Sequence, residues 1–95
     1  MHRFIALIRF TDQGAKGIAE STQRAKQFDA IAEKVGVEIE GQYWTFGSYD
    51  GVLIIRSASE QAALRCLAKL VSEGNVKTET LTAFTEEGFK NILTA

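Results

Sequence analysis

The sequence predicts one α+β domain, and three observations support this fold class. Four strand-like segments and two amphipathic helix-like segments follow one another in the order βαββαβ. At 95 residues the chain has material for one hydrophobic core, so a single domain is predicted over residues 1–95. Hydrophobic residues make up 45% of the chain and charged residues 24%, which is typical of a globular domain and not of a disordered one.

The first strand is predicted over residues 4–10, where apolar residues are nearly continuous and therefore suit a central position in a sheet. Apolar residues then recur at helical spacing over residues 18–35, with an irregular turn near Gly17. Ser21 is predicted to be the N-cap of this helix and Gly36 to end it. Its solvent side is predicted to carry the charged and amide residues Arg24, Lys26, Gln27, Glu33 and Lys34.

A hairpin follows the first helix. Residues 37–46 alternate in polarity and begin with charged residues, which predicts an edge strand with Ile39 and Tyr43 on one face and Trp44 on the other. Glycines at both ends of residues 47–51 suit a tight reversal, and the apolar residues 52–55 predict a second central strand.

The second half of the chain predicts a helix, an edge strand and a short C-terminal helix. Ser57 and Glu60 fit a capping box, and Gly74 is predicted to end the second helix. The threonine-rich residues 75–84 alternate as an edge strand does. The last helix is predicted to open at Thr85, and its apolar residues are expected to dock on the domain: Phe89, Ile92 and Leu93.

Right-handed crossovers place the first and third strands in the middle of the sheet, which makes the arrangement ferredoxin-like. Both central strands are apolar on both faces, whereas two helices cover only one face. We therefore predict a homodimer through the sheet; the alternative is that the C-terminal helix covers the bare face. In the first strand, Phe4, Ala6 and Ile8 are predicted to face the helices, and Ile5, Leu7 and Arg9 the partner.

Charge and cysteine content exclude several classes of function. Eleven Lys and Arg oppose twelve Asp and Glu without a long run of either sign, so no nucleic-acid partner is expected. No apolar stretch is long enough for a membrane span, so no membrane partner is expected. One cysteine, Cys66, and one histidine, His2, supply no metal site and no disulfide, and a cytoplasmic location is predicted. Cys66 is predicted to be an inert, partly buried thiol.

Three stretches together carry a family resemblance: residues 11–14 (TDQG), 43–50 (YWTFGSYD) and 74–85 (GNVKTETLTAFT). The chain resembles the GYD-domain family along essentially its whole length. This resemblance implies a ferredoxin-like dimeric α/β barrel. The wider superfamily includes cofactor-free monooxygenases, lactone isomerases and haem-binding chlorite-processing enzymes, while the GYD family has no established activity. Lys77 and Thr82 stand where the family pattern leads us to expect arginines, so an anion site built on those arginines is not expected.

The predicted ligand-binding residues are Trp44, Tyr49, Asp50 and Thr80. The phenol of Tyr49 could donate to a ligand, and the carboxylate of Asp50 could accept from it or act as a base. Trp44 offers a flat surface for a planar ligand, and Thr80 is the middle of three threonines that could offer hydroxyls inside a barrel. The competing interpretation is structural: Asp50 caps the turn, the aromatic residues pack, and the threonines reflect strand propensity.

These observations lead to three hypotheses for the function. The leading one is an uncharacterised small dimeric α/β-barrel protein that binds a small apolar or aromatic molecule and needs no cofactor. The second is a cofactor-free oxygenase or isomerase, for which no catalytic residue is assigned. The third is a structural or protein-interaction module. Catalytic triad, phosphate-loop and dinucleotide motifs do not occur in the sequence.

Overall fold

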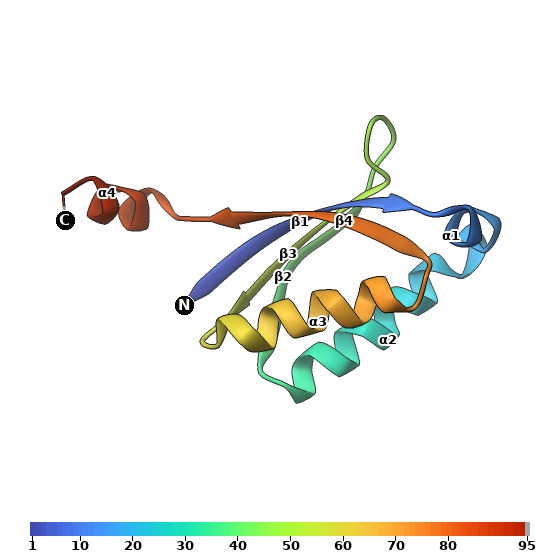
Figure 1. The fold of residues 1–95 in the computed structure, drawn as a ribbon, viewed down its shortest axis with the longest axis horizontal. Helices are drawn as coiled ribbons and strands as arrows, with labels where there is room; N and C mark the ends of the chain where they lie inside the picture. Colours follow the sequence, from blue (N-terminus) through green and yellow to red (C-terminus); the bar gives the residue numbers. More distant parts are fainter. Residues whose placement is uncertain (95) are drawn as a thin grey trace.

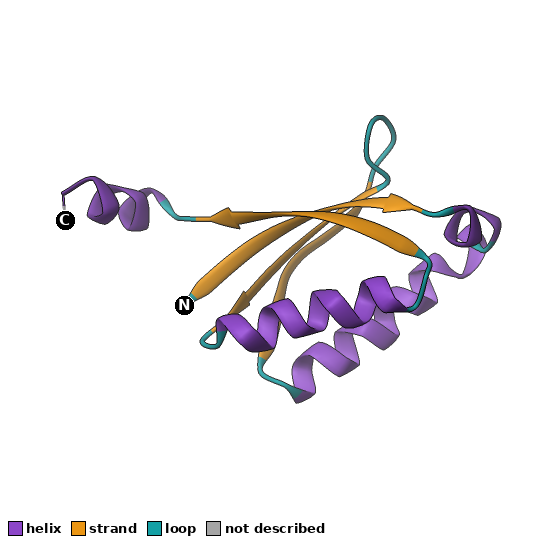
Figure 2. Cartoon of the chain, viewed as in Figure 1, coloured by secondary structure: helices purple, strands orange, loops and turns teal. Residues whose placement is uncertain are grey.

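The computed structural model describes residues 1–94 and has an antiparallel four-stranded sheet with two long helices on one face (Figure 1). Figure 2 shows that the opposite face of the sheet carries no helix. The elements are β1 (His2–Phe10), α1 (Asp12–Lys16), η1 (Ile18–Glu20), α2 (Ser21–Lys34), β2 (Val37–Trp44), β3 (Gly51–Ser57), α3 (Glu60–Ser72), β4 (Val76–Ala83) and α4 (Glu86–Thr94).

The strand order is β2-β3-β1-β4, so the predicted α+β, ferredoxin-like fold class is confirmed. The two strands that are apolar on both faces, β1 and β3, occupy the centre, and the two with charged or threonine-rich faces form the edges. The irregular entry predicted near Gly17 is also confirmed, because α1 and η1 precede α2. The dimeric barrel stays a prediction.

The core lies between the sheet and helices α2 and α3. Phe4 and Ala6 of β1 are buried there and Ile8 packs against the same cluster, which confirms the predicted helix-facing side of the first strand. The other buried hydrophobic residues of this cluster are Phe28, Ala32, Val37, Leu53, Ile55, Ala63, Cys66 and Leu67. Cys66 is only 4% exposed, and burial raises the pKa of its thiol, so it is protonated at neutral pH and a poor nucleophile.

A β-bulge in β2 overturns the predicted alternation of that strand. The pairing with β3 shifts between Ile39 and Gly41, so that Ile39 lies opposite Ile55 but Tyr43 lies opposite Val52. Because alternate residues of β3 point to opposite faces, Ile39 and Tyr43 face opposite sides of the sheet, not the same side as predicted. One extra residue therefore turns Trp44 toward the helices and Tyr43 away from them.

Two of the predicted helix caps are wrong, and the glycine stops are right. Ser21 is the first residue of α2, and no side-chain hydrogen bond caps this helix. The N-cap of α3 is Ser59, whose side chain accepts from the backbone N–H of Ala62, whereas the Ser57 hydroxyl donates to the carbonyl of Gly36. Gly36 and Gly74 follow α2 and α3 with φ of 77° and 85°, a conformation that suits glycine.

Helix α4 does not dock on the domain, so this prediction is wrong. Only residues 84–85 separate it from β4, and the chain continues away from the sheet without a reversal (Figure 1). The described chain extends 48 Å along its longest axis against 31 and 18 Å along the others. Phe89, Ile92 and Leu93 are 52%, 50% and 70% exposed. The alternative prediction, in which the C-terminal helix covers the helix-free face of the sheet, is therefore also wrong.

Candidate functional site

A cavity of about 120 Å³ lies between the sheet and the helical layer, close to the end of β2. Its wall combines apolar side chains with a few polar groups, an arrangement typical of small-molecule sites. The lining includes Phe10, Ser21, Arg24, Phe28, Trp44 and Asp50.

Trp44 ends β2 and lines this cavity. Its indole Nε1–H donates to Ser21 Oγ at 3.2 Å, so the ring joins the edge strand to the first turn of α2. The side chain remains 47% exposed, which leaves it at the cavity wall and not in the core. Trp44 thus combines the packing role and the wall position that the sequence left as alternatives.

Asp50 also lines the cavity, but its polar groups are largely engaged in holding the sheet together. Its Oδ2 accepts from the backbone N–H of Phe10 at 2.8 Å, and its own backbone N–H donates to the carbonyl of Ile8 at 2.7 Å. Its carbonyl accepts from the N–H of Thr45 at 2.9 Å. This set of bonds supports the turn-forming interpretation of Asp50, because all three tie the hairpin to itself or to the end of β1.

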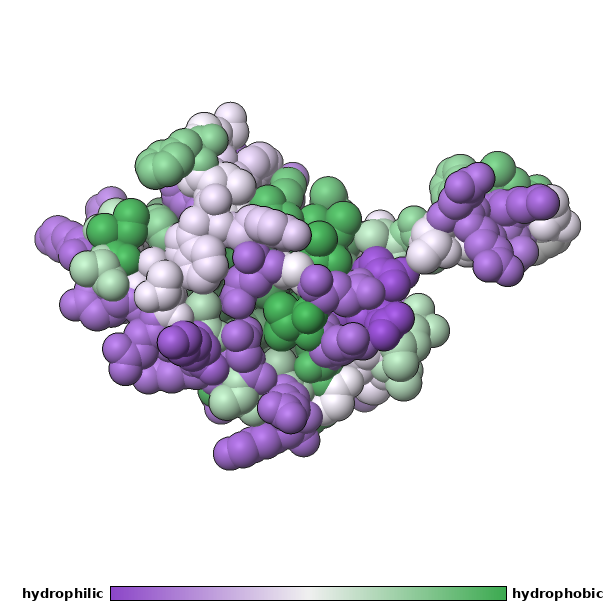
Figure 3. All heavy atoms as spheres, turned by 180° about the vertical axis from the view of Figure 1, so that it is seen from behind, coloured by the Kyte–Doolittle hydropathy of each residue, from purple (hydrophilic) through white to green (hydrophobic). Residues whose placement is uncertain are grey.

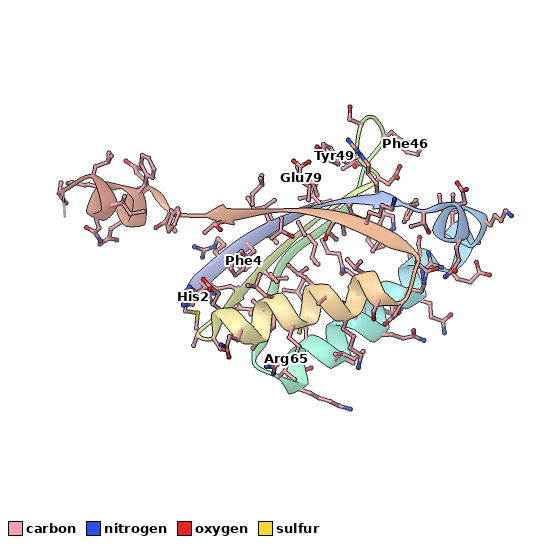
Figure 4. The ribbon with its side chains drawn as sticks, viewed as in Figure 1. His2, Phe4, Phe46, Tyr49, Arg65 and Glu79 are labelled. Atoms are coloured by element: carbon pink, nitrogen blue, oxygen red, sulfur yellow. The ribbon has the colours of Figure 1, made fainter. Side chains whose placement is uncertain are left out.

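Tyr49 lies on the other side of the sheet. The guanidinium of Arg9 stacks 4.7 Å from the centre of its ring, and its hydroxyl is 3.4 Å from both carboxylate oxygens of Glu79. Figure 4 shows Tyr49 and Glu79 close together on the helix-free side. Tyr49 and Asp50 are therefore neighbours in sequence that serve different faces, so they do not converge on one substrate as the oxygenase or isomerase hypothesis requires.

Thr80 is likewise separate from the cavity. It lies opposite Ala6 on the helix-facing side of the edge strand β4, with Thr78 and Thr82 on the same face as predicted. Thr80 is exposed and does not line the cavity. Of the four predicted ligand-binding residues, the structure brings together Trp44 and Asp50, and their role in binding stays a prediction.

Arg24 was predicted to lie on the solvent side of α2, and this prediction is wrong. The side chain lines the cavity, and its Nη1 donates to the carbonyl of Gly17 at 2.8 Å. Its Nη2 is shielded from solvent and has no hydrogen-bond partner within residues 1–94. A signal was present, because Ser21, Arg24 and Phe28 recur at the spacing of residues that share one side of a helix.

The helix-free side of the sheet, here called the open face, is a second candidate site. Its centre consists of half-buried or exposed apolar side chains from three strands: Ile5, Leu7, Val52, Ile54 and Leu81. Charged pairs flank this centre, with Arg3 Nε 2.6 Å from Glu40 Oε1 and Arg56 paired with Glu38. The Arg3 guanidinium beside Glu40 lowers the pKa of that carboxyl, and Glu40 in turn raises the pKa of Arg3.

Metal binding and membrane insertion are two further classes of function on which the described residues bear. Residues 1–94 contain no group of three or more His, Cys, Asp or Glu side chains placed to hold a metal ion. Within the same residues no helix has the length and apolar character needed to cross a membrane. The cytoplasmic location stays a prediction.

The fold, the cavity and the open face define a ferredoxin-like α+β domain with one unpartnered sheet surface. The family model of the GYD domain matches residues 4–93, and the chain belongs to this family. A relative from Thermus thermophilus is named glutamine synthetase and cystathionine beta-lyase binding protein. It is 34% identical over 84 residues, which cover 87% of this chain and 88% of the relative. No solved structure matches the chain significantly.

Proposed function

We propose that the chain is a protein-binding module that forms a homodimer through its open face and contacts an enzyme through α4. The observation that carries this proposal is the relative named as a binding protein for glutamine synthetase and cystathionine beta-lyase, which aligns with most of this chain. Two unpartnered apolar surfaces, the open face and α4, supply places where protein partners would bind.

The open face supports the homodimer. An apolar centre with a charged rim is the anatomy of protein interfaces, and a contiguous apolar patch of several hundred Å² is rare on a monomer. Leu7 lies on the central strand β1, opposite Val52 of β3 on one side and Glu79 of β4 on the other. A two-fold contact would bury the same residues on both protomers, and roughly 800 Å² per partner suffices for a stable dimer.

Helix α4 supports the contact with an enzyme. Figure 3 shows it as a separate lobe with hydrophobic and hydrophilic side chains on different sides. Phe89, Ile92 and Leu93 fall on one side at the spacing i, i+3, i+4, while Asn91 lies on the opposite side. An amphipathic helix with this spacing binds by placing its apolar side in a groove of another protein. We name glutamine synthetase and cystathionine beta-lyase as the candidate partners, by similarity to the relative.

Biolayer interferometry with purified glutamine synthetase and cystathionine beta-lyase from the source organism tests this function. We expect the unmodified chain to bind at least one of the two enzymes. The double variant Phe89→Ser, Ile92→Ser should bind more than about tenfold more weakly, because it removes two apolar contacts of roughly 1.5–3 kcal/mol each. Asn91→Ser is the matched control and should bind as the unmodified chain does.

Two results would contradict the proposal. If the unmodified chain bound neither enzyme, these two enzymes would be excluded as its partners. Equal binding by the double variant and by Asn91→Ser would show that α4 is not the contact. Circular dichroism of each variant verifies that the helix and the domain remain folded.

A second function, binding of a small apolar or aromatic molecule, is favoured by the cavity. Its volume of about 120 Å³ is close to that of an apolar cavity that holds one benzene molecule, roughly 150 Å³. The cavity therefore suits a ligand, or part of a ligand, of about one ring. Indole and toluene in a thermal-shift assay test this function, and absence of any stabilisation at saturation would argue against it.

A further inference from the structure

We propose that the loop of residues 45–50, here called the hairpin loop, contacts a second copy of this chain, with Phe46 as the side chain that packs on it. This inference rests on the homodimer proposed through the open face, and it adds a second contact region to that interface. The proposed contact with an enzyme through α4 is separate from it.

The hairpin loop stands on the same side of the sheet as the open face. Figure 1 shows it between β2 and β3, rising from the sheet on the side opposite α2 and α3, and Figure 4 shows Phe46 and Tyr49 there. Two sheets that pack face to face lie about 10 Å apart. Six residues separate Trp44 from Gly51, and three extended residues span at most about 10 Å. A second sheet placed on the open face therefore lies within reach of the loop.

Hydrogen bonds hold the hairpin loop in one conformation. Thr45 Oγ1 donates to the carbonyl of Tyr49 at 2.7 Å, and the Thr45 backbone N–H donates to the carbonyl of Asp50 at 2.9 Å. Arg9 Nε donates to the carbonyl of Ser48 at 3.0 Å, and the Arg9 guanidinium stacks on the ring of Tyr49. A loop that is already ordered loses little conformational entropy when it binds, so an apolar contact made by this loop contributes fully to the affinity.

Phe46 carries the largest unshielded apolar surface of this loop. It is 105% exposed, and Tyr43, in the strand that leads into the loop, is 62% exposed and also faces the open side. A single exposed apolar residue is common on a protein surface, but here the apolar surface continues from the open face into the hairpin. Large aromatic side chains that become buried supply much of the energy of a protein interface. In a two-fold dimer this contact occurs twice.

The second copy is the occupant that the geometry favours. A groove on an enzyme could also take an exposed phenylalanine, but nothing in the position of the hairpin loop requires such a groove. By contrast, any sheet that covers the open face meets the loop, because both lie on the helix-free side.

Analytical ultracentrifugation over a concentration series tests the contribution of Phe46 to the dimer. We expect Phe46→Ser to raise the dissociation constant of the dimer at least about hundredfold, because the burial of two phenylalanine side chains is lost. Ser48→Ala is the matched control on the same loop and should leave the dissociation constant unchanged, since the backbone carbonyl of Ser48, and not its hydroxyl, accepts from Arg9. Circular dichroism verifies that both variants fold.

A second measurement, on the unmodified sequence, places Phe46 relative to the partner directly. Dimers are mixed from two deuterated protomers, one with protonated phenylalanine rings and the other with protonated isoleucine, leucine and valine methyl groups. We expect intermolecular nuclear Overhauser effects between the ring of Phe46 in one protomer and methyl groups of the other.

The outcomes distinguish this inference from the proposed homodimer. A monomeric unmodified chain would overturn both. A dimer that Phe46→Ser does not weaken, or whose Phe46 ring shows no intermolecular effect, would overturn the role of the hairpin loop and leave the homodimer in place. Weaker binding of Phe46→Ser to glutamine synthetase or cystathionine beta-lyase, with an unchanged dimer, would also overturn it, because the loop would then belong to the enzyme contact.

Discussion

Adjacent residues of β1 provide the sharpest test of the open face, because a charge placed at each should have a different effect. Leu7 points to the open face and is half-buried in the protomer, whereas Ala6 points into the core and is 0% exposed. We expect Leu7→Asp to fold and to lose the dimer. We expect Ala6→Asp to unfold the protomer.

The expected magnitudes follow from burial. Full burial of a leucine side chain is worth roughly 1.5–3 kcal/mol, and the loss occurs once in each protomer. The total of roughly 3–6 kcal/mol raises the dissociation constant of the dimer about 10²- to 10⁴-fold. At Ala6 an ionised carboxylate would be buried without a partner, which costs several kcal/mol of a total stability of about 5–15 kcal/mol.

Light scattering coupled to size-exclusion chromatography, from about 1 to 100 µM, measures the assembly, and circular dichroism measures the folding. The unmodified chain should have the mass of a dimer and Leu7→Asp that of a monomer with unchanged helix content. A monomeric unmodified chain at the highest concentration would refute the dimer. A folded Ala6→Asp together with an unfolded Leu7→Asp would refute the assignment of the two faces.

Two further changes test the hairpin and the rim of the open face. Asp50→Ala removes the acceptor of the Phe10 backbone N–H and should lower the free energy of unfolding, measured in urea titrations, by about 1.5–3 kcal/mol. Asp50→Asn keeps an acceptor oxygen and should lower it less. Equal losses in the two variants would show that the charge of Asp50, and not its hydrogen bond, stabilises the hairpin. Arg3 lowers the pKa of Glu40 in the folded chain. The stability that ionised Glu40 contributes is therefore present above the pKa of glutamate in the unfolded chain, roughly 4.3, and is lost as the pH falls through the lower pKa of the folded chain. Glu40→Gln should therefore lose less thermal stability than the unmodified chain between about pH 5 and pH 3. Parallel pH profiles of the two chains would contradict the stabilising role of the Arg3–Glu40 pair.

Local periodicity was sufficient for the element order and for the first strand. Residues 4–10 are apolar except for Arg9, and the side that holds Arg9 could not be buried beneath helices, so the assignment of the two faces followed from the sequence. The same method failed in β2, because a single extra residue at the bulge changes the parity of every later side chain. One signal was present, because Gly41 lies inside the strand pattern and an isolated glycine there often marks a bulge.

The candidate site was predictable only in part. Trp44 and Asp50 were found from the hairpin motif, and both line the cavity. Tyr49 was paired with Asp50 because they are adjacent, yet the turn sends their side chains to opposite faces. Arg24 was assigned to the solvent side because arginine is mostly exposed, and the position of its guanidinium depends on the carbonyl of Gly17, which only the turn before α2 brings within reach.

The sequence by itself determined the strand order, the central positions of β1 and β3 and the need to cover a second apolar face, because these depend on the spacing and polarity of residues within each segment. The tertiary structure decided which side chains share the cavity, where α4 lies and which nitrogen lacks a partner. These features depend on contacts between segments far apart in the chain. Such contacts are set by the packing of whole elements and leave no local pattern to recognise.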